Sequence, residues 1–285
     1  MHFTKMQGIG NDYIYVDGAK EKVSDKAAAA VALSDRHFGI GSDGIIFINP
    51  SETADFEMEM YNADGSRGKM CGNGIRCVAK YVYDHRMIHS REIRIETLAG
   101  VKTISVRTDE HDLVREARVD MGAPVLTPRD VPVLLEGEDV IGRCVTIAGG
   151  VYKITCVSVG NPHCVIFMDQ DVRKLDLPAI GPAFEHDPLF PEQVNTEFVN
   201  VIDDHTVFMR VWERGSGETL ACGTGSCAVA AASFLGGHTG RSVCVRLLGG
   251  ELLDEWDEKT GHMFMTGPAA TSFEGDVDLT VFGVN

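Results

Sequence analysis

The sequence predicts an α+β protein built from two similar halves, and three observations lead to that fold class. Short segments with the alternating pattern of half-buried strands recur along the chain, the clearest being residues 56–61, Phe-Glu-Met-Glu-Met-Tyr. Only four segments have helical character. Three polar motifs of the first part return in the second part at one offset. The composition, 44% hydrophobic and 24% charged, is that of a folded globular chain, and 285 residues allow two domains.

The expected strands are short and several are bounded by Gly, Pro or Asp. They are 13–16, 45–48, 56–61, 92–97, 102–106, 152–159, 164–168, 207–212, 243–247 and 262–265. The four expected helices are 25–38, 72–83, about 177–186 and 223–235. Ser24 is the expected N-cap of the first helix and Gly39 its stop. The last helix is almost wholly small or apolar, so it has to be enclosed by the strands of its own half.

The internal repeat is the strongest evidence for two halves. Cys71-Gly72-Asn73-Gly74 returns as Cys222-Gly223-Thr224-Gly225. Asn11 precedes Cys71 by 60 positions and Asn161 precedes Cys222 by 61, while Asn62 and Glu213 each lie nine positions before their cysteine. A shared offset of about 150 residues predicts a duplicated fold with a pseudo-twofold axis. The Pro- and Gly-containing region 118–144 is the expected crossing, which gives halves 1–118 and 119–271.

Each cysteine motif places a thiol immediately before a glycine-rich turn into an expected helix. A helix N-terminus carries unpaired N–H groups and the positive end of the helix dipole, which lower a cysteine pKa and bind carboxylates. Two such thiols related by a twofold axis would face each other across one site. One could remove an α-proton while the other delivers a proton to the opposite face. The pattern therefore indicates inversion at a carbon by Cys71 and Cys222, a reaction that in principle needs no cofactor.

Other interpretations of the cysteines stay open at this point. A single cysteine beside a helix start is usually just a small buried residue. The chain could also be a non-catalytic thiol redox or zinc-binding protein. Chelation within one helix is disfavoured, because Cys71 and Cys77 are six positions apart and Cys222 and Cys227 five, whereas neighbours on one helix face are three or four apart. We expect Cys77 and Cys227 to lie in the core.

Five motifs carry a resemblance to a known family. They are Gly10-Asn11-Asp12-Tyr13, Asn62-Ala63-Asp64-Gly65-Ser66, Met70-Cys71-Gly72-Asn73-Gly74-Ile75-Arg76-Cys77, Gly160-Asn161-Pro162-His163, and the run from Glu213-Arg214-Gly215 to Cys222-Gly223-Thr224-Gly225. Together they span most of the chain, in family order, and resemble the signatures of diaminopimelate epimerases. That family interconverts LL- and meso-diaminopimelate for lysine and peptidoglycan synthesis, without pyridoxal phosphate or metal.

The resemblance implies a fold and a set of site residues. The fold would be two pseudo-twofold-related domains, each a mixed sheet wrapped around a central helix, with the active site in the cleft between them and the last strand, about 272–285, returning to the first half. The catalytic pair falls on Cys71 and Cys222. The substrate-binding residues fall on Asn11, Asn62, Asn161, Asn195, Glu213 and Arg214, and the backbone carboxylate cradles on Gly72, Asn73, Gly223 and Thr224. Family members are homodimers, so the resemblance also implies a homodimer.

Two departures from the family pattern concern substrate affinity. Some members have Gln after the Asp at the position where this chain has Ser42-Asp43-Gly44, so a side-chain contact from position 44 is lost or replaced by backbone. The segment Arg67-Gly68-Lys69 is more basic than the acidic residues often found there. Neither departure affects the catalytic pair. The role of His163 is left open: its side chain could orient a cysteine or only cap its own loop.

The nearest enzyme alternative is a racemase of proline or hydroxyproline, which shares the duplicated fold and two cysteines. We disfavour it because Glu213-Arg214-Gly215 supplies polar groups suited to a second amino-acid head. Phenazine-biosynthesis isomerases are built similarly but lack the two-cysteine pair. Arg214 is the best candidate for a distal carboxylate, because its planar fork can grip a carboxylate at two points.

Charge and composition exclude other classes of partner. A formal net charge of −16 disfavours nucleic acids and anionic membranes. No apolar run approaches the roughly 20 residues of a membrane-spanning helix, and residues 1–11 lack the pattern of a secretory signal. We therefore expect a cytoplasmic enzyme with a small-molecule substrate and reduced thiols.

Overall fold

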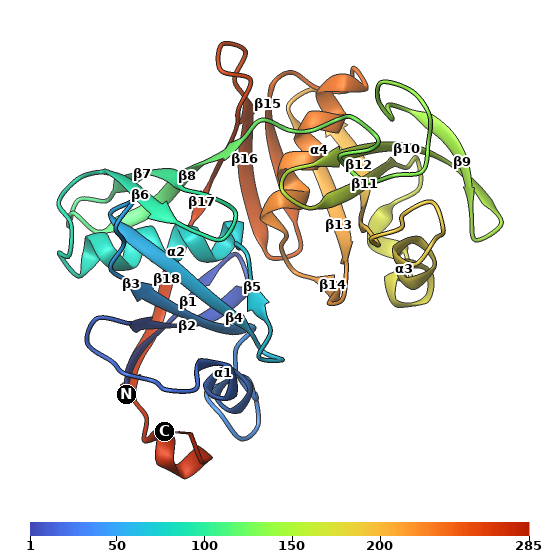
Figure 1. Ribbon diagram of the computed structural model, residues 1–285. Coiled ribbons are helices and arrows are strands. Elements are labelled where there is room, and N and C mark those ends of the chain that lie inside the picture. Colours follow the sequence, from blue (N-terminus) through green and yellow to red (C-terminus); the bar gives the residue numbers. More distant parts are fainter. Residues whose placement is uncertain (285) are drawn as a thin grey trace. The chain divides into compact units, whose positions relative to one another are not determined.

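A computed structural model describes residues 1–284 and separates into two compact units (Figure 1). Unit 1 contains Met1–Val119 together with the chain from Gly267 onward, and unit 2 contains Asp120–Thr266. The predicted halves, residues 1–118 with about 272–285 and residues 119–271, stay a proposal for the units of the duplication.

Unit 1 is a mixed sheet around a buried helix. Its elements are β1 (His2–Gly8), β2 (Asn11–Asp17), α1 (Lys26–Ser34), β3 (Gly44–Asn49), β4 (Phe56–Asn62), β5 (Arg67–Gly68), α2 (Gly72–Asp84), β6 (Glu92–Glu96), β7 (Lys102–Thr108), β8 (Val114–Gly122), β18 (Ala270–Asp276) and the 3₁₀ helix η2 (Leu279–Phe282). The strands pair in the order β18-β1-β2-β3-β4-β6-β7-β8. Pairs β2–β3 and β4–β6 are parallel and the others antiparallel. Helix α2 packs against β1, β2, β7 and β18.

Unit 2 has the same construction. Its elements are β9 (Arg143–Ile147), β10 (Gly150–Ser158), β11 (Pro162–Phe167), the 3₁₀ helix η1 (Val172–Lys174), α3 (Leu177–Glu185), β12 (Asn195–Asp203), β13 (Thr206–Glu213), β14 (Gly217–Thr219), α4 (Gly223–Leu235), β15 (Ser242–Leu247), β16 (Gly250–Trp256) and β17 (Met263–Pro268). The strands pair in the order β9-β10-β11-β12-β13-β15-β16-β17. Helix α4 packs against β10 to β13, β15 and β16.

The two units repeat one topology. From β1 to β8 and from β10 to β17, the pairs run antiparallel, parallel, antiparallel, parallel, antiparallel and antiparallel. The register agrees as well, because Ile14, three residues after Asn11, pairs with Ile45, and Cys164, three residues after Asn161, pairs with Thr196. The predicted α+β fold, duplicated and wrapped around central helices, is confirmed.

The central helices owe their stability to burial. In α2, twelve consecutive residues from Gly72 to Tyr83 are buried, and in α4 so are nine of the ten from Gly223 to Ala232. Helical propensity contributes little to a sequence with two glycines in its first turn, so packing against the surrounding strands has to hold both helices. Cys77 and Cys227 are fully buried, as expected of core residues.

The first helix differs from its prediction at both ends. Its N-cap is Asp25 rather than Ser24, with the Asp25 carboxylate accepting a hydrogen bond of 2.9 Å from the Ala28 N–H. It ends at Ser34, and the Asp35 carboxylate then accepts hydrogen bonds from His37 N and Phe38 N. Asp is a strong competitor for backbone N–H groups, which is why it ends the helix four residues early.

Several strands were missed by the sequence pattern, for two different reasons. Strand β1 buries Thr4 and Lys5 beside its apolar residues, so it shows no alternation. The five residues from Asn195 to Val199 of β12 are all buried, polar ones included. Strand β18 is largely exposed and pairs with β1 in unit 1, but it stops at Asp276 and is followed by η2, so only the first part of the expected strand from about 272 is extended. Residue 285 of that expectation lies outside the described residues. Strands β8, β9 and β16 were also not predicted.

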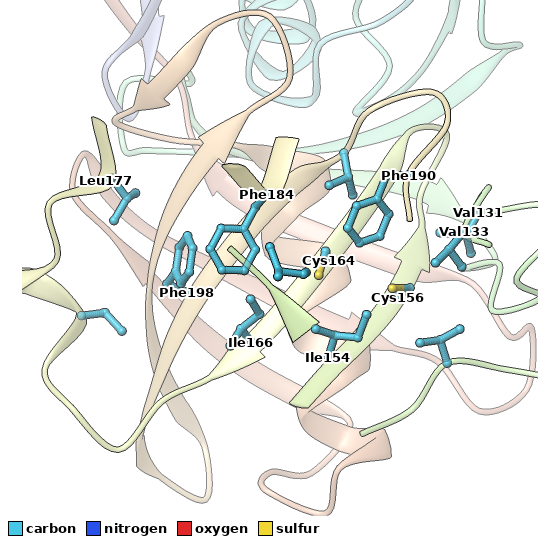
Figure 2. Close-up of a cluster of buried hydrophobic side chains, with 14 of the residues drawn as sticks. Val131, Val133, Ile154, Cys156, Cys164, Ile166, Leu177, Phe184, Phe190 and Phe198 are labelled. Carbon is cyan, nitrogen blue, oxygen red and sulfur yellow. The ribbon is translucent and has the colours of Figure 1, made fainter. Parts of the chain in front are cut away.

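A core cluster of unit 2 combines aliphatic, cysteine and phenylalanine side chains (Figure 2). Phe184 of α3 stacks edge-on against Phe198 of β12, with ring centroids 5.2 Å apart. Cys156 and Cys164, paired across β10 and β11, are buried in the same cluster. This core fixes the strands that carry the polar residues described next. No helix among residues 1–284 is long and apolar enough to cross a membrane.

Candidate active site

Cys71 is the N-cap residue of α2. Its backbone is extended (φ −127°, ψ 119°), and its sulfur accepts a hydrogen bond of 3.3 Å from the Gly74 N–H. A side chain at this position satisfies one of the N–H groups that a helix leaves unpaired at its start. A Cβ at position 74 would lie 2.9 Å from Ile46 Cδ1, so a larger residue there would displace this side chain. The first turn of α2 thus brings the thiol against backbone donors.

Asn11 connects Cys71 to a group of charged residues. Its side-chain oxygen accepts a hydrogen bond of 3.2 Å from the Cys71 thiol, and its amide nitrogen donates to the Asp43 carboxylate at 2.7 Å. Arg36 binds both Asp43 and Asp12, at 3.0 and 2.7 Å. Burial raises the pKa of Asp43, whereas at Asp12 hydrogen bonds from Arg36 and Lys5 outweigh burial and lower the pKa. Asp43, which sequence reasoning did not select, therefore fixes the Asn11 amide with its oxygen toward Cys71.

Cys222 is the N-cap residue of α4 and has a more enclosed setting. It has nearly the same backbone conformation as Cys71 (φ −126°, ψ 111°) but no side-chain capping hydrogen bond, and its sulfur lies 3.5 Å from Thr224 Oγ1. Burial raises the pKa of the Cys222 thiol well above its ordinary value, and the nearby carboxyls of Glu213 and Glu197 raise it further. The two cysteines therefore occupy equivalent backbone positions but differ in burial, Cys71 being partly exposed and Cys222 buried.

A buried His–Glu pair lies beside the start of α4. His163 Nδ1 is 2.6 Å from Glu197 Oε1, and His163 Nε2 is 3.0 Å from Asn161 Oδ1. Both His163 and Glu197 are 0% exposed. A Cβ added to Gly225 would lie 2.8 Å from Glu197 Oε1 and 3.2 Å from the Cys222 sulfur, so the carboxyl reaches the first turn of α4. Glu197 was not predicted as a site residue, because its strand β12 was not predicted.

The remaining predicted binding residues of unit 2 form one group on β12 and the β13–β14 turn. Asn195 is buried; its amide nitrogen donates to Pro162 O at 2.8 Å, and its oxygen accepts from the Arg214 N–H at 2.9 Å. The Arg214 guanidinium is partly exposed and donates to Glu192 O at 2.8 Å. The Glu213 carboxylate accepts a hydrogen bond from the Thr219 hydroxyl. Asn195 thus ties the backbone of Arg214 to the strand carrying Glu197.

Asn62, the predicted binding residue on β4, hydrogen-bonds within its own loop. Its backbone N–H donates to Ser66 O at 2.9 Å and its amide nitrogen to Ser66 Oγ at 3.0 Å. The basic Arg67 pairs with Glu59 on β4 at 3.4 Å.

The four predicted cradle residues begin the two central helices. Gly72 and Asn73 open α2, and Gly223 and Thr224 open α4. The Asn73 side chain is turned inward, where its oxygen accepts a hydrogen bond of 3.0 Å from Arg76 Nη1. Arg76 is fully buried and also donates to Gly72 O and Pro268 O, each at 3.2 Å. The Asn73 side-chain oxygen is therefore occupied within the protein, and the cradle role of residue 73 stays a prediction for its backbone.

Gly44 has no room for a side chain. A Cβ there would lie 2.1 Å from Tyr61 O and 2.8 Å from a Tyr13 ring carbon. By register, position 44 in unit 1 corresponds to Asn195 in unit 2, which does carry a side chain. That a side-chain contact from position 44 is lost or replaced by backbone stays a prediction.

We expect Gly44→Ala to lower the free energy of unfolding by about 1–3 kcal/mol, because the added Cβ overlaps backbone atoms that cannot swing aside. The matched control is Gly240→Ala, where an added Cβ meets nothing within 4 Å, and a change within about 0.5 kcal/mol is expected. Urea denaturation followed by circular dichroism measures both. Equal midpoints for wild type and Gly44→Ala would show that β3 and β4 move apart at no cost.

Among residues 1–284 no cluster of three or more His, Cys, Asp or Glu side chains could hold a metal ion. All eight cysteines are free thiols.

Solved structures with the same architecture define the fold class. A hydroxyproline epimerase from Agrobacterium vitis, crystallised with bound trans-4-hydroxy-L-proline, aligns with a TM-score of 0.67 at 15% identity, covering 96% of this chain and 91% of that one. A phenazine biosynthesis protein of the PhzF family from Bacillus anthracis aligns with a TM-score of 0.69 at 15% identity, covering 98% and 99%. The chain thus has the duplicated α+β fold of the epimerases and PhzF-type proteins.

Sequence relatives specify the family. The family model for diaminopimelate epimerase matches residues 3–127 and 155–272. Diaminopimelate epimerase of Methanococcus maripaludis is 53% identical over 279 residues, 98% of this chain and 100% of that protein. The diaminopimelate epimerase of Desulfovibrio desulfuricans is 54% identical over 282 residues, 97% and 98% of the two chains. The chain belongs to the diaminopimelate epimerase family and is an isomerase.

Proposed function

We propose that the protein interconverts LL- and meso-diaminopimelate by a two-base mechanism, with Cys71 and Cys222 as thiolate and thiol and with no cofactor. The observation that carries the proposal is the repetition of one arrangement, a cysteine capping a glycine-rich helix start, at equivalent positions of the two units. Relatives about 50% identical over nearly the whole chain are named diaminopimelate epimerases, which supports the substrate.

In this mechanism the thiolate removes the α-proton from one face of the substrate. The electron pair stays on the α-carbon and its carboxylate, where the N–H groups at the starts of α2 and α4 would stabilise the developing charge. The other cysteine then gives its proton to the opposite face. The configuration is inverted, and the thiol and thiolate have exchanged roles, so the reverse reaction uses the same two groups.

The binding residues divide the work by chemistry. The backbone of Gly72, Asn73, Gly223 and Thr224 would hold the carboxylate beside the reacting carbon, since these residues open the two helices. The second head of the substrate carries an ammonium and a carboxylate. We propose that Asn11, Asn62, Asn161, Asn195, Glu213 and Arg214 bind the substrate, with Glu213 suited to the ammonium and Arg214 to the distal carboxylate.

The decisive experiment is incubation of the purified protein with LL-diaminopimelate in deuterated water. Deuterium is expected at the α-carbon of the meso product, because the thiol that delivers the hydrogen exchanges with solvent. Proton NMR and mass spectrometry follow the label. Absence of epimerisation would remove the proposed function, and epimerisation with complete retention of the original hydrogen would replace the two-base mechanism with a one-base mechanism.

The family membership also suggests the setting of this reaction. We propose that the enzyme works in lysine and peptidoglycan precursor synthesis, in the cytoplasm and as a homodimer.

A further inference from the structure

Burial of the pair formed by His163 and Glu197 lowers the stability of the fold. A carboxyl taken out of water loses its hydration, and this loss is recovered only through well-placed partners. Glu197 Oε1 has His163, but Glu197 Oε2 has no hydrogen-bond partner among residues 1–284. Burial accordingly raises the pKa of Glu197. A group that costs free energy and is only half satisfied needs a reason other than stability.

Unit 1 shows that the fold does not require this carboxyl. By register, the residue equivalent to Glu197 is Ile46. The equivalent residues Cys164 and Ile14 pair with Thr196 and Ile45, and Glu197 and Ile46 are the next residues along those strands. The surroundings agree, because a Cβ on Gly74 would meet Ile46 as a Cβ on Gly225 would meet Glu197. The residue equivalent to His163 is Tyr13. One topology is therefore built with an isoleucine in one unit and a buried acid in the other.

The hydrogen bonds of His163 determine where its protons are. Both ring nitrogens face oxygen atoms, Glu197 Oε1 and Asn161 Oδ1. An amide oxygen can only accept, so Nε2 has to carry a hydrogen. Nδ1 and Glu197 Oε1 share a second proton between them. The Asn161 oxygen is consequently occupied by His163, and its amide hydrogens are directed away from the ring.

Asn11, the equivalent residue of unit 1, is held the other way round. Its amide nitrogen is occupied by Asp43 and its oxygen faces the Cys71 thiol. Two equivalent asparagines thus present opposite ends, an acceptor in unit 1 and donors in unit 2. An acidic residue fixes each asparagine. Asp43 lies directly before β3, the strand that pairs with β2, and Glu197 lies on β12, the strand that pairs with β11.

We propose that Glu197 is a positioning residue that, through His163, holds the Asn161 amide with its hydrogens toward the substrate, where they donate to a carboxylate. The inference rests on the proposed function, in which Asn161 binds the substrate. Glu197 itself touches no substrate. Its negative charge keeps the second proton in the pair, so that Nε2 remains a donor. Without that charge the ring holds one hydrogen. When the side chain at position 197 still offers an acceptor oxygen, as Gln does, Nδ1 retains that hydrogen and Asn161 turns its amide to donate to Nε2.

The test compares Glu197→Gln, Glu197→Ile and the control Asp254→Asn. Gln keeps the size of the side chain and removes its charge, and Ile reproduces the residue of unit 1. Asp254 on β16 is a second fully buried carboxyl of unit 2, and it accepts a hydrogen bond from Cys227 in α4. Its substitution controls for the loss of any buried acid beside that helix. Thermal unfolding establishes that each variant is folded.

The first measurement is long-range proton–nitrogen NMR of the histidine rings at neutral pH, which needs no turnover. Nε2 of His163 is expected to be protonated in the wild type and in Asp254→Asn, and unprotonated in Glu197→Gln. An unprotonated Nε2 in the wild type overturns the proposal, and so does an unchanged ring in Glu197→Gln.

The second measurement is steady-state epimerisation of LL-diaminopimelate. Loss of a hydrogen bond to the substrate carboxylate is expected to raise KM about tenfold in Glu197→Gln, with kcat within about threefold of wild type. In Glu197→Ile no acceptor faces Nδ1, so the single hydrogen stays on Nε2 and KM is expected to remain within about threefold of wild type. A merely structural role predicts that the isosteric Gln rescues KM, which would contradict the proposal. An inactive wild type would instead remove the proposed function, while the NMR result still decides the state of the pair.

Discussion

Substitution of Cys71 or Cys222 by alanine is expected to reduce epimerisation by at least about 10³-fold, because each change removes the acid or the base on one face of the substrate. The folds should remain intact. Cys71 and Cys222 are N-cap residues, and of the two only Cys71 makes a capping hydrogen bond with its side chain. The measurement is the rate of LL-to-meso conversion at saturating substrate, with circular dichroism to verify folding.

Two other cysteines provide matched controls for this prediction. Cys77 in α2 and Cys227 in α4 are fully buried in the same two helices and face the core. Cys77→Ala and Cys227→Ala should retain activity within about threefold and lose about 1 kcal/mol of stability, since each removes one buried sulfur. Retention of more than a few per cent of activity by Cys71→Ala or Cys222→Ala would rule out the two-thiol mechanism.

Substrate choice is expected to be the second large effect. The helix starts at Cys71 and Cys222 would hold the carboxylate of any α-amino acid, so selectivity has to come from the side chains for the second head. Proline, hydroxyproline and lysine lack one or both charged groups of that head and would leave polar side chains unpaired. Sites of this kind reject such ligands by roughly 10⁴-fold in kcat/KM. Epimerisation is therefore expected for LL- or meso-diaminopimelate and essentially not for the other three amino acids.

The Arg214→Met variant tests the same selectivity by changing a residue of the protein instead of the substrate. It should impair turnover of diaminopimelate strongly while Cys71 and Cys222 remain titratable with a thiol reagent. The control is Arg246→Met, because Arg246 is exposed on β15 and pairs with the exposed Glu251. Wild-type kinetics for Arg214→Met, or racemisation of proline as efficient as that of diaminopimelate, would show that the substrate is assigned wrongly even if the mechanism holds.

The two-unit fold could be predicted from sequence because its landmarks are local. Cys71 and Cys222 each precede glycines and an apolar helix, and such patterns do not depend on distant residues. The acids that fix the asparagines could not be found in this way. Asp43 looks like a turn residue, and Glu197 lies in β12, where burial on both faces abolishes alternation. A glutamate within a fully buried strand was the one sequence feature that could have pointed to a site residue. Its role depends on His163, which lies beside it only because β11 pairs with β12.

The position of β18 at the end of the chain affects the order in which the two units can complete their folding during synthesis. Strand β1 pairs with β2 on one side and with β18 on the other, and Arg76 in α2 donates to Pro268 O just before β18. Unit 2 is contiguous in sequence and can fold as soon as residue 266 has left the ribosome. Unit 1 begins earlier, yet it is completed only when β18 follows. Until then β1 exposes an unpaired edge, which is a site for aggregation. The half that carries Cys71 is therefore translated first and completed last, when β18 covers the open edge of β1.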